Sequence, residues 1–316
     1  PGSRGRRSTW VGGVKAPGPP VDRGSAVNDD RHPDDFETRF WLGTVAAGAW
    51  ITVLMCSVNA FYLVFFVEPA NRLGVGASLV AATIGGAVAL LAVVVSVWAV
   101  KLTTLALSTG RSADYWSEPR GDTGGLLYVA LGDSAAQGIG ASRPERGYVG
   151  LLAQRLRDST GRPVLVVNLS SSGARISDVL DTQLPALAAL GREPDLLTVG
   201  IGGNDVRAYD RDVFAAATAR LTAALPAGAF VADAPYFMHG RWERDAQQAA
   251  DLLTRSATGR GLHPVPLHEA LRAQGPGAML TQFAADWFHP NDRGHRVWAD
   301  AFWREMQRAG VVPPLS

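Results

Sequence analysis

Cysteine is nearly absent from this sequence, with a single residue, Cys56, among 316. An internal disulfide is therefore excluded, and a lone thiol inside a long apolar run carries no information on the redox state of the compartment. The formal net charge is only +1, which gives no indication of a nucleic-acid partner. The sequence begins with Pro1 rather than Met, which leaves open a natural start further upstream.

The signatures of metal and nucleotide binding are also missing. Four histidines lie apart without the spacing of metal ligands: His32, His239, His263 and His268. The segment Gly138-Ile139-Gly140 lacks the lysine of a phosphate loop, and Arg143 stands where a dinucleotide fingerprint needs a third glycine. We therefore expect no metal site and no organic cofactor.

Charged residues are absent from two long stretches, residues 41–67 and residues 75–100. At about 1.5 Å per residue, a helix of either length can cross a hydrocarbon core of roughly 30 Å. We predict two transmembrane helices joined by a tight turn at residues 68–74, with the lipid bilayer as the partner of residues 41–100. The alternatives are a hydrophobic hairpin of a soluble domain and an export signal, but the apolar region of an export signal is much shorter.

Basic residues flank the two predicted spans unequally. Arg31 and Arg39 precede them, Lys101 and Arg111 follow them, and the tight turn has only Arg72. The positive-inside tendency therefore predicts a two-pass membrane protein with both ends, and hence the C-terminal domain, on the cytoplasmic side.

Composition divides the chain into five segments. A disordered N-terminal segment rich in Gly, Pro, Ser and Arg is followed by the membrane region, a linker, a globular domain and a short tail. Their predicted bounds are residues 1–40, 41–107, 108–124, 125–310 and 311–316.

Within residues 125–310, short apolar runs alternate with helical patterns. The runs predict strands at residues 126–131, 164–169, 196–201, 229–234 and 263–267. The patterns predict helices at residues 148–158, 176–190, 211–225, 242–258 and 291–309. Runs that are apolar throughout are typical of strands buried on both faces, and strand–helix alternation predicts a doubly wound α/β fold with a parallel sheet.

Polar or glycine-bearing turns follow three of these strands, and a fourth precedes the last helix. They are Leu131-Gly132-Asp133-Ser134, Asn168-Leu169-Ser170-Ser171-Ser172-Gly173, Gly200-Ile201-Gly202-Gly203-Asn204-Asp205 and Asp286-Trp287-Phe288-His289-Pro290. In a doubly wound sheet, ligands bind beyond the carboxyl ends of the strands. We therefore expect the four turns to meet at one edge of the sheet.

These turns contain the groups that acyl transfer requires. A serine hydroxyl is a poor nucleophile until a base takes its proton, and histidine suits that task near neutral pH. Ser134 and His289 supply such a pair, and Asp286 lies three residues before His289 to fix its tautomer. The backbone N–H groups of Ser134 and Gly173 and the side-chain amide of Asn204 could stabilise an oxyanion.

Simpler structural roles compete with this interpretation. Ser134 could be an ordinary turn residue, and Asn204 alone is more often a helix N-cap. Asp133 is expected to bond the backbone of its turn. His295 is a rival base, but we expect it to lie inside the last helix and to face elsewhere.

The order and spacing of the four blocks resemble the SGNH hydrolases, also called the GDSL family. The resemblance extends over about residues 126–309 and does not include the membrane region. It implies a flavodoxin-like three-layer α/β/α sandwich with a five-stranded parallel sheet. It also implies a nucleophile, a base and its orienting acid, and an oxyanion hole: Ser134, His289 and Asp286, with Ser134, Gly173 and Asn204. Ala135 replaces the leucine of many members, at a position that need not contact substrate.

The resemblance implies a membrane-tethered serine hydrolase that cleaves carboxylic esters through an acyl-serine intermediate. A small-molecule or lipid ester is the expected partner, and four aromatic residues are expected to shape the acyl pocket: Tyr236, Phe237, Trp287 and Phe288. Two alternatives stay open, an acyltransferase that passes the acyl group to an acceptor other than water and a catalytically silent membrane-anchored binding module.

Overall fold

The computed structural model of the chain describes residues 75–237 and 240–312. These residues lie in one compact unit of the chain. The predicted disordered segment 1–40, the predicted first span 41–67 and the predicted turn 68–74 lie outside the described residues.

A mixed sheet of six strands, in the order β1-β3-β2-β4-β5-β6, forms the centre of the unit. The strands are β1 (Arg120–Gly121), β2 (Leu126–Gly132), β3 (Val164–Asn168), β4 (Leu196–Gly200), β5 (Phe230–Ala232) and β6 (His263–Val265). Strands β2 to β6 pair in parallel and lie where the apolar runs predicted strands. The expected purely parallel sheet of five strands needs correction, because β1 pairs antiparallel with β3 at the edge. Two residues are too few to produce a recognisable apolar pattern.

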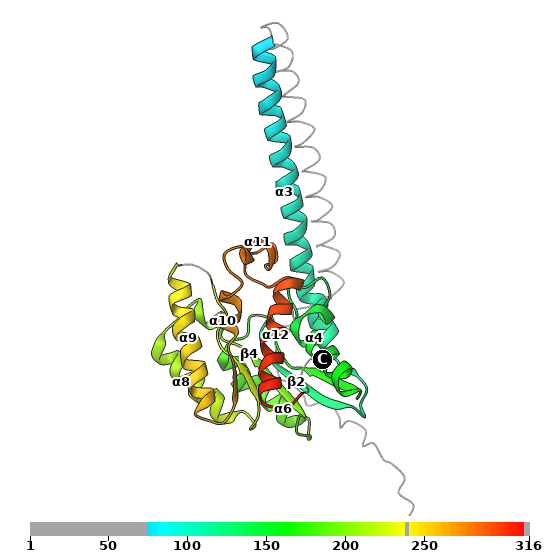
Figure 1. The fold of residues 1–316 in the computed structure, drawn as a ribbon, viewed down its shortest axis with the longest axis vertical. Helices are drawn as coiled ribbons and strands as arrows, with labels where there is room; N and C mark the ends of the chain where they lie inside the picture. Colours follow the sequence, from blue (N-terminus) through cyan, green and yellow to red (C-terminus); the bar gives the residue numbers. More distant parts are fainter. Residues whose placement is uncertain (1–74, 238–239, 313–316) are drawn as a thin grey trace, which may run out of the picture. The chain divides into compact units, whose positions relative to one another are not determined.

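Helices cover both faces of this sheet (Figure 1). The longer ones are α4 (Tyr148–Thr160), α8 (Arg211–Ala224), α9 (Gly240–Thr258) and α12 (Asp292–Arg308). All four lie where helices were predicted. The predicted helix 176–190 is divided into α5 (Ile176–Asp178), the π-helical η3 (Val179–Gln183) and α6 (Leu184–Ala189). Four shorter elements were not predicted: η2 (Pro144–Arg146), α7 (Gly203–Val206), α10 (Leu267–Arg272) and α11 (Ala278–Thr281).

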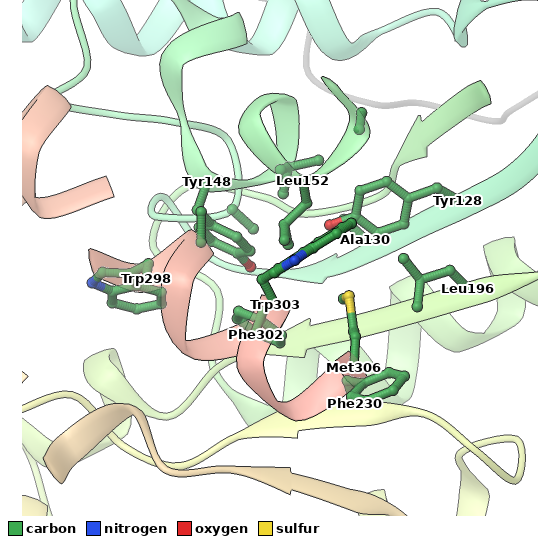
Figure 2. Close-up of a cluster of buried hydrophobic side chains, with 14 of the residues drawn as sticks. Tyr128, Ala130, Tyr148, Leu152, Leu196, Phe230, Trp298, Phe302, Trp303 and Met306 are labelled. Carbon is green, nitrogen blue, oxygen red and sulfur yellow. The ribbon is translucent and has the colours of Figure 1, made fainter. Parts of the chain in front are cut away.

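Two hydrophobic clusters fill the spaces between the layers. The first joins the sheet to α4 and α12, and the second joins its other face to η3, α8 and α9. In the first cluster, Tyr148 stacks on Phe302 with ring centroids 5.2 Å apart and on Trp298 with centroids 5.4 Å apart (Figure 2). Alternate side chains of β2, β3, β4 and β5 enter opposite clusters, which explains why these strands are mostly apolar.

Helix α3 (Val75–Trp116) precedes the sheet and extends further than the sequence predicted. Residues 108–116 were expected to be part of a linker, but they form its last turns. Ser108, Ser112 and Trp116 are buried there, and Trp116 Nε1 donates to the carbonyl oxygen of Gln137 at 3.1 Å. Helix formation at this polar stretch is therefore stabilised by packing on the domain, which local sequence does not reveal.

One stretch of α3, Thr83–Trp116, is long and apolar enough to cross a membrane, with a mean hydropathy of 2.3 in its most apolar window. It overlaps the predicted span 75–100 but continues past it. Among the described residues this is the one helix that meets that description.

The strand order determines where a crevice opens. The chain runs from β2 to β3 on one side and then returns to β4 on the other side of β2. Helices that follow such strands leave on opposite faces, so a crevice forms beyond the carboxyl ends of β2 and β4. Three of the turns singled out in the sequence follow β2, β3 and β4.

Candidate active site

Ser134, His289 and Asp286 form one continuous hydrogen-bonded row, although Ser134 and His289 are 155 positions apart. The distance from His289 Nε2 to Ser134 Oγ is 2.9 Å, and that from His289 Nδ1 to Asp286 Oδ2 is 2.5 Å. This arrangement can take a proton from the serine and hold the resulting imidazolium beside a carboxylate.

The environment of Asp286 favours its ionised form. Partial burial opposes ionisation, but the hydrogen bond and the electrostatic interaction with the His289 ring outweigh it and lower the pKa of the Asp286 carboxyl. Asp286 Oδ1 also accepts the backbone N–H groups of Phe288 and His289, at 3.1 and 3.0 Å. These bonds hold the Asp286 carboxylate in one orientation and favour its ionised form.

A short closed loop carries Asp286 and His289. The N–H of Ala284 donates to the carbonyl oxygen of His289 at 2.8 Å, and the side chain of Asn291 caps α12 by accepting two backbone N–H groups. Between them, Trp287 has a φ of 57°, which is rare for a bulky residue. Such strain persists only where the surrounding bonds enforce it, and it is common in functional loops.

Ser134 follows directly on β2, and Gly132 makes that position possible. A Cβ at Gly132 would lie 2.3 Å from the carbonyl oxygen of Gly200, so no larger residue fits there. The side chain of Gln183 forms two hydrogen bonds with the backbone of Gly132. Gln183 Oε1 accepts the N–H of Gly132, and Gln183 Nε2 donates to the carbonyl oxygen of Gly132, both at 2.8 Å. These bonds fix the backbone two residues before Ser134. Gln183 was not predicted as a site residue, because it lies in a π-helical turn that the sequence pattern does not reveal.

Asp133 has the structural role expected of it. Its Oδ1 accepts the N–H of Ala135 at 3.0 Å, and burial raises the pKa of its carboxyl to about 6. His295 lies inside α12, as expected, and bonds away from Ser134. Its Nε2 contacts the carbonyl oxygen of Ile139 at 3.0 Å, and burial lowers its pKa to about 4. A buried neutral histidine of this kind braces the loop after Ser134.

Two further polar side chains hold the same loop, and neither was given a role from the sequence: Asn168 begins the second of the four turns, and Gln137 lies outside them. Asn168 Nδ2 donates to the carbonyl oxygen of Ala136 at 2.8 Å, and Gln137 Nε2 donates to that of Ser170 at 3.1 Å. These bonds tie the turn after β2 to the turn after β3. A polar side chain at a strand end is a general feature, so only the folded structure shows its partner.

Gly173 and Asn204 lie close to one another but outside the row of Ser134, His289 and Asp286. Asn204 Nδ2 donates to the carbonyl oxygen of Ala174, next to Gly173, at 3.0 Å. Gly173 is exposed and has a φ of 79°, which favours glycine. Within the described residues, the backbone N–H groups of Ser134 and Gly173 donate to no carbonyl oxygen. They are therefore available to a ligand.

A largely apolar cavity of about 80 Å³ opens beside Ser134 and His289. The four aromatic residues expected at the acyl pocket line it: Tyr236, Phe237, Trp287 and Phe288. Phe237 and Phe288 contact each other with ring centroids 5.9 Å apart, and Phe288 meets His289 edge to face. The site can therefore accept a small apolar group next to the serine. No group of three or more potential metal ligands occurs in residues 75–237 and 240–312.

Comparison with known proteins identifies the family to which the chain is similar. The model of the GDSL-like Lipase/Acylhydrolase family matches residues 130–297, which include Ser134 and His289. No curated protein matches the chain.

Several solved structures are similar. LAE5, an alpha/beta hydrolase enzyme from the metagenome of Lake Arreo in Spain, has 23% identity over 58% of this chain and 95% of its own, with a TM-score of 0.48. Axe2, an acetylxylan esterase from Geobacillus stearothermophilus, has 23% identity over 57% and 94%, with a TM-score of 0.47. TesA has 24% identity over 58% and 99%, with a TM-score of 0.48.

Proposed function

Because the chain belongs to the GDSL-like lipase/acylhydrolase family, we propose that it is a membrane-anchored serine hydrolase that cleaves carboxylic esters. Ser134 is the nucleophile, His289 is the general base, and Asp286 positions His289. The observation that carries the proposal is the position of the His289 ring, 2.9 Å from Ser134 Oγ and 2.5 Å from Asp286 Oδ2.

The reaction follows from this geometry in two halves. In the first, Ser134 Oγ bonds to the ester carbonyl carbon as its proton passes to His289 Nε2, and the ester C–O bond breaks as the alcohol takes that proton. In the second, water loses a proton to His289 and attacks the acyl-serine, and Ser134 recovers its proton as the carboxylic acid leaves. Asp286 accepts from Nδ1 throughout, so Nε2 is the nitrogen that exchanges protons.

The negative charge that forms on the carbonyl oxygen needs donors already in place. The N–H groups of Ser134 and Gly173 have no other acceptor among the described residues, and the Asn204 amide has a second N–H beside the one given to Ala174. We assign the oxyanion hole to these three groups.

Substitution of Ser134 by Ala tests the nucleophile. Turnover of a p-nitrophenyl ester should fall by at least about 10³-fold, because a triad without its nucleophile retains only weak catalysis. Labelling by a fluorophosphonate should disappear as well. Ser159→Ala, at the far end of α4, is the matched control and should keep both signals. Retained turnover in a folded Ser134→Ala protein would refute the assignment.

The membrane anchor is the other part of the proposal. Thr83–Trp116 has the length and hydropathy of a span, and ten of its large apolar side chains are exposed in the described structure, Leu90 and Leu91 to 66% and 62%. Such an exposed apolar surface is stable in lipid and not in water. A second span at residues 41–67 would place both flanks on one side of the membrane, and the basic residues of these flanks favour the cytoplasmic side. Digestion of the C-terminal domain by protease added outside intact cells would contradict that orientation.

A further inference from the structure

A groove of about 640 Å³ runs between α3 and the loop that carries Asp286 and His289. It is lined from α3 by Trp98, Lys101 and Arg111, and from the opposite side by Leu280, Trp287 and Arg293. Figure 1 shows α11, which contains Leu280, beside α3. Nothing in the proposed ester hydrolysis accounts for this groove.

The sequence of α3 indicates how deep the groove would lie relative to a bilayer that the helix spans. Residues 75–100 are uncharged, and Lys101 is the first charged residue of the helix. About 20 helical residues cross a hydrocarbon core, so the boundary with the headgroups falls near Lys101. Trp98, one turn earlier, is the residue type that gathers at that boundary. The groove therefore begins where lipid headgroups lie.

The loop that carries Asp286 and His289 reaches the same level. Trp98 Nε1 donates to the carbonyl oxygen of Ala285, the neighbour of Asp286, at 3.1 Å. Close by, Leu280 is 77% exposed and Trp287 is 48% exposed. Large apolar side chains exposed beside a spanning helix are stabilised when they enter the interfacial region of a bilayer.

The charge of the groove is positive. Within the described residues, Lys101, Arg111 and Arg293 form no ion pair with a carboxylate. The acidic residue of the groove, Asp292, is already bonded to Arg146 Nη1 at 2.9 Å and to the Ser142 hydroxyl at 2.8 Å. Lys101 lies at headgroup level, and Arg111 and Arg293 extend the positive charge of the groove beyond it; these uncompensated cations are the complement of an anionic lipid.

The groove lies next to the catalytic cavity. Phe283 and Trp287 line both spaces, so they form the wall between a headgroup position and Ser134. We propose that the groove binds the phosphate headgroup of an anionic membrane phospholipid, which brings an ester of that lipid to Ser134 from the leaflet. This inference rests on the proposed ester hydrolase and names the substrate class of its site.

The test compares an anionic with a zwitterionic phospholipid substrate. The full chain is reconstituted in vesicles that contain phosphatidylglycerol and phosphatidylcholine with distinguishable acyl chains, and the released fatty acids are measured by mass spectrometry. We expect phosphatidylglycerol to be hydrolysed about 10-fold faster or more at low salt, since each basic residue near an anionic lipid surface strengthens binding. The triple variant K101Q/R111Q/R293Q should lower this ratio to about 2 or less.

A charge-matched control separates local from general electrostatics. R162Q/R220Q/R260Q removes the same charge from three exposed arginines away from the groove and should keep the wild-type ratio. A second arm adds inorganic phosphate at constant ionic strength, and the preference should persist, because free phosphate lacks the acyl chains that anchor the lipid. Its loss in that arm would show a phosphate site rather than a lipid site and would overturn the inference.

The failure of the inference can be told apart from failure of the proposed function. If the chain hydrolyses a soluble p-nitrophenyl ester but hydrolyses the two lipids at equal rates, the proposed ester hydrolase stands and the headgroup site is refuted. If the wild-type chain hydrolyses no ester at all, the proposed function itself is refuted.

Discussion

At the scale of single residues, we propose two separable tasks for Asn204. Its amide donates one N–H to the carbonyl oxygen of Ala174, which braces the turn that carries Gly173, and we assign its second N–H to the oxyanion. If the second task dominates, Asn204→Ala should lower kcat by about 10²-fold with little change in KM, because the lost donor acts mainly on the transition state. Steady-state kinetics on a p-nitrophenyl ester measures both constants.

A purely structural role for Asn204 makes a different prediction. Loss of the bond to Ala174 would then lower the thermal midpoint and disturb KM, with kcat changed only a few-fold. The matched control is Asn168→Ala, which removes an amide that braces the carbonyl oxygen of Ala136 and should lower stability more than kcat. A kcat within two-fold of the wild type would remove Asn204 from the oxyanion hole.

The contrast between His289 and Gln183 shows which residues the sequence could predict. Ser134, His289 and Asp286 were predicted because each lies in a turn at a strand end or before the last helix, with a spacing that acyl transfer explains. Gln183 was not predicted, since a glutamine in a helical pattern is usually exposed. Its importance comes from a π-helical turn that aims the amide at Gly132, and such turns are often found at functional sites.

At the scale of elements, strands β2 to β5 were predictable because burial on both faces leaves mostly apolar residues in each. The end of α3 was not. Residues 108–116 include serines, glycine and two charged side chains, a composition typical of a linker, yet Trp116 packs into the cluster beneath α4 and α12. Tertiary packing decided the structure of this segment, and a single sequence contains no signal for it.

The packing of α4 against α12 leads to a second prediction. Tyr148 is fully buried and its hydroxyl has no hydrogen-bond partner among the described residues, whereas its ring stacks on Phe302. Tyr148→Phe keeps the ring and removes a desolvated polar group. The free energy of unfolding should stay the same or rise by about 1 kcal/mol. Phe302→Ala, by contrast, should lower it by about 3–5 kcal/mol, because a large buried ring is lost.

Denaturant unfolding of the two variants in the same detergent measures this difference. A clear loss of stability in Tyr148→Phe, of about 2 kcal/mol, would mean that a bound water satisfies the hydroxyl. It would place a polar site inside the first hydrophobic cluster.

At the scale of the whole molecule, buried carboxyls make stability depend on pH. Burial raises the pKa of Asp233 to about 7, and its Oδ1 accepts the N–H of His268 at 2.7 Å. A carboxyl whose pKa is higher in the folded than in the unfolded state costs stability as pH rises. The unfolded chain ionises from about pH 4, and the folded one only near pH 7. The cost is absent below about pH 4 and complete above about pH 7.

Asp233→Asn isolates this contribution, because an amide oxygen can still accept from His268. As the pH rises from 4 to 7, the thermal midpoint of the wild type should decrease relative to that of the variant. The decrease should correspond to a few kcal/mol in the free energy of unfolding. The difference between the two proteins is the relevant quantity, since Asp133, whose pKa is also raised, and Asp286, whose pKa is lowered, contribute equally to both. Parallel midpoint curves would show that Asp233 is ionised in the folded protein at low pH.

The last prediction concerns where the catalytic domain begins. If residues 108–116 were a linker, a chain shortened to start at Ser117 would be as stable as one that starts at Thr103. In the structure, however, Trp116 is only 7% exposed and donates to the carbonyl oxygen of Gln137, three residues after Ser134. Removal of that side chain exposes apolar surface and leaves a buried carbonyl unpaired, a loss of about 3–5 kcal/mol.

The chain from Ser117 should therefore melt about 10 °C or more below the chain from Thr103, and it should turn over a soluble ester more slowly, because Gln137 lies in the loop that positions Ser134. Trp116→Phe in the chain from Thr103 keeps the aromatic packing and removes only the N–H donor, so its midpoint should lie between the two. Equal midpoints for both shortened chains would restore the linker that the sequence predicted. A large difference would show that α3, the helix long and apolar enough to span a membrane, ends inside the catalytic domain. Trp116 would then connect this helix to the loop that follows Ser134.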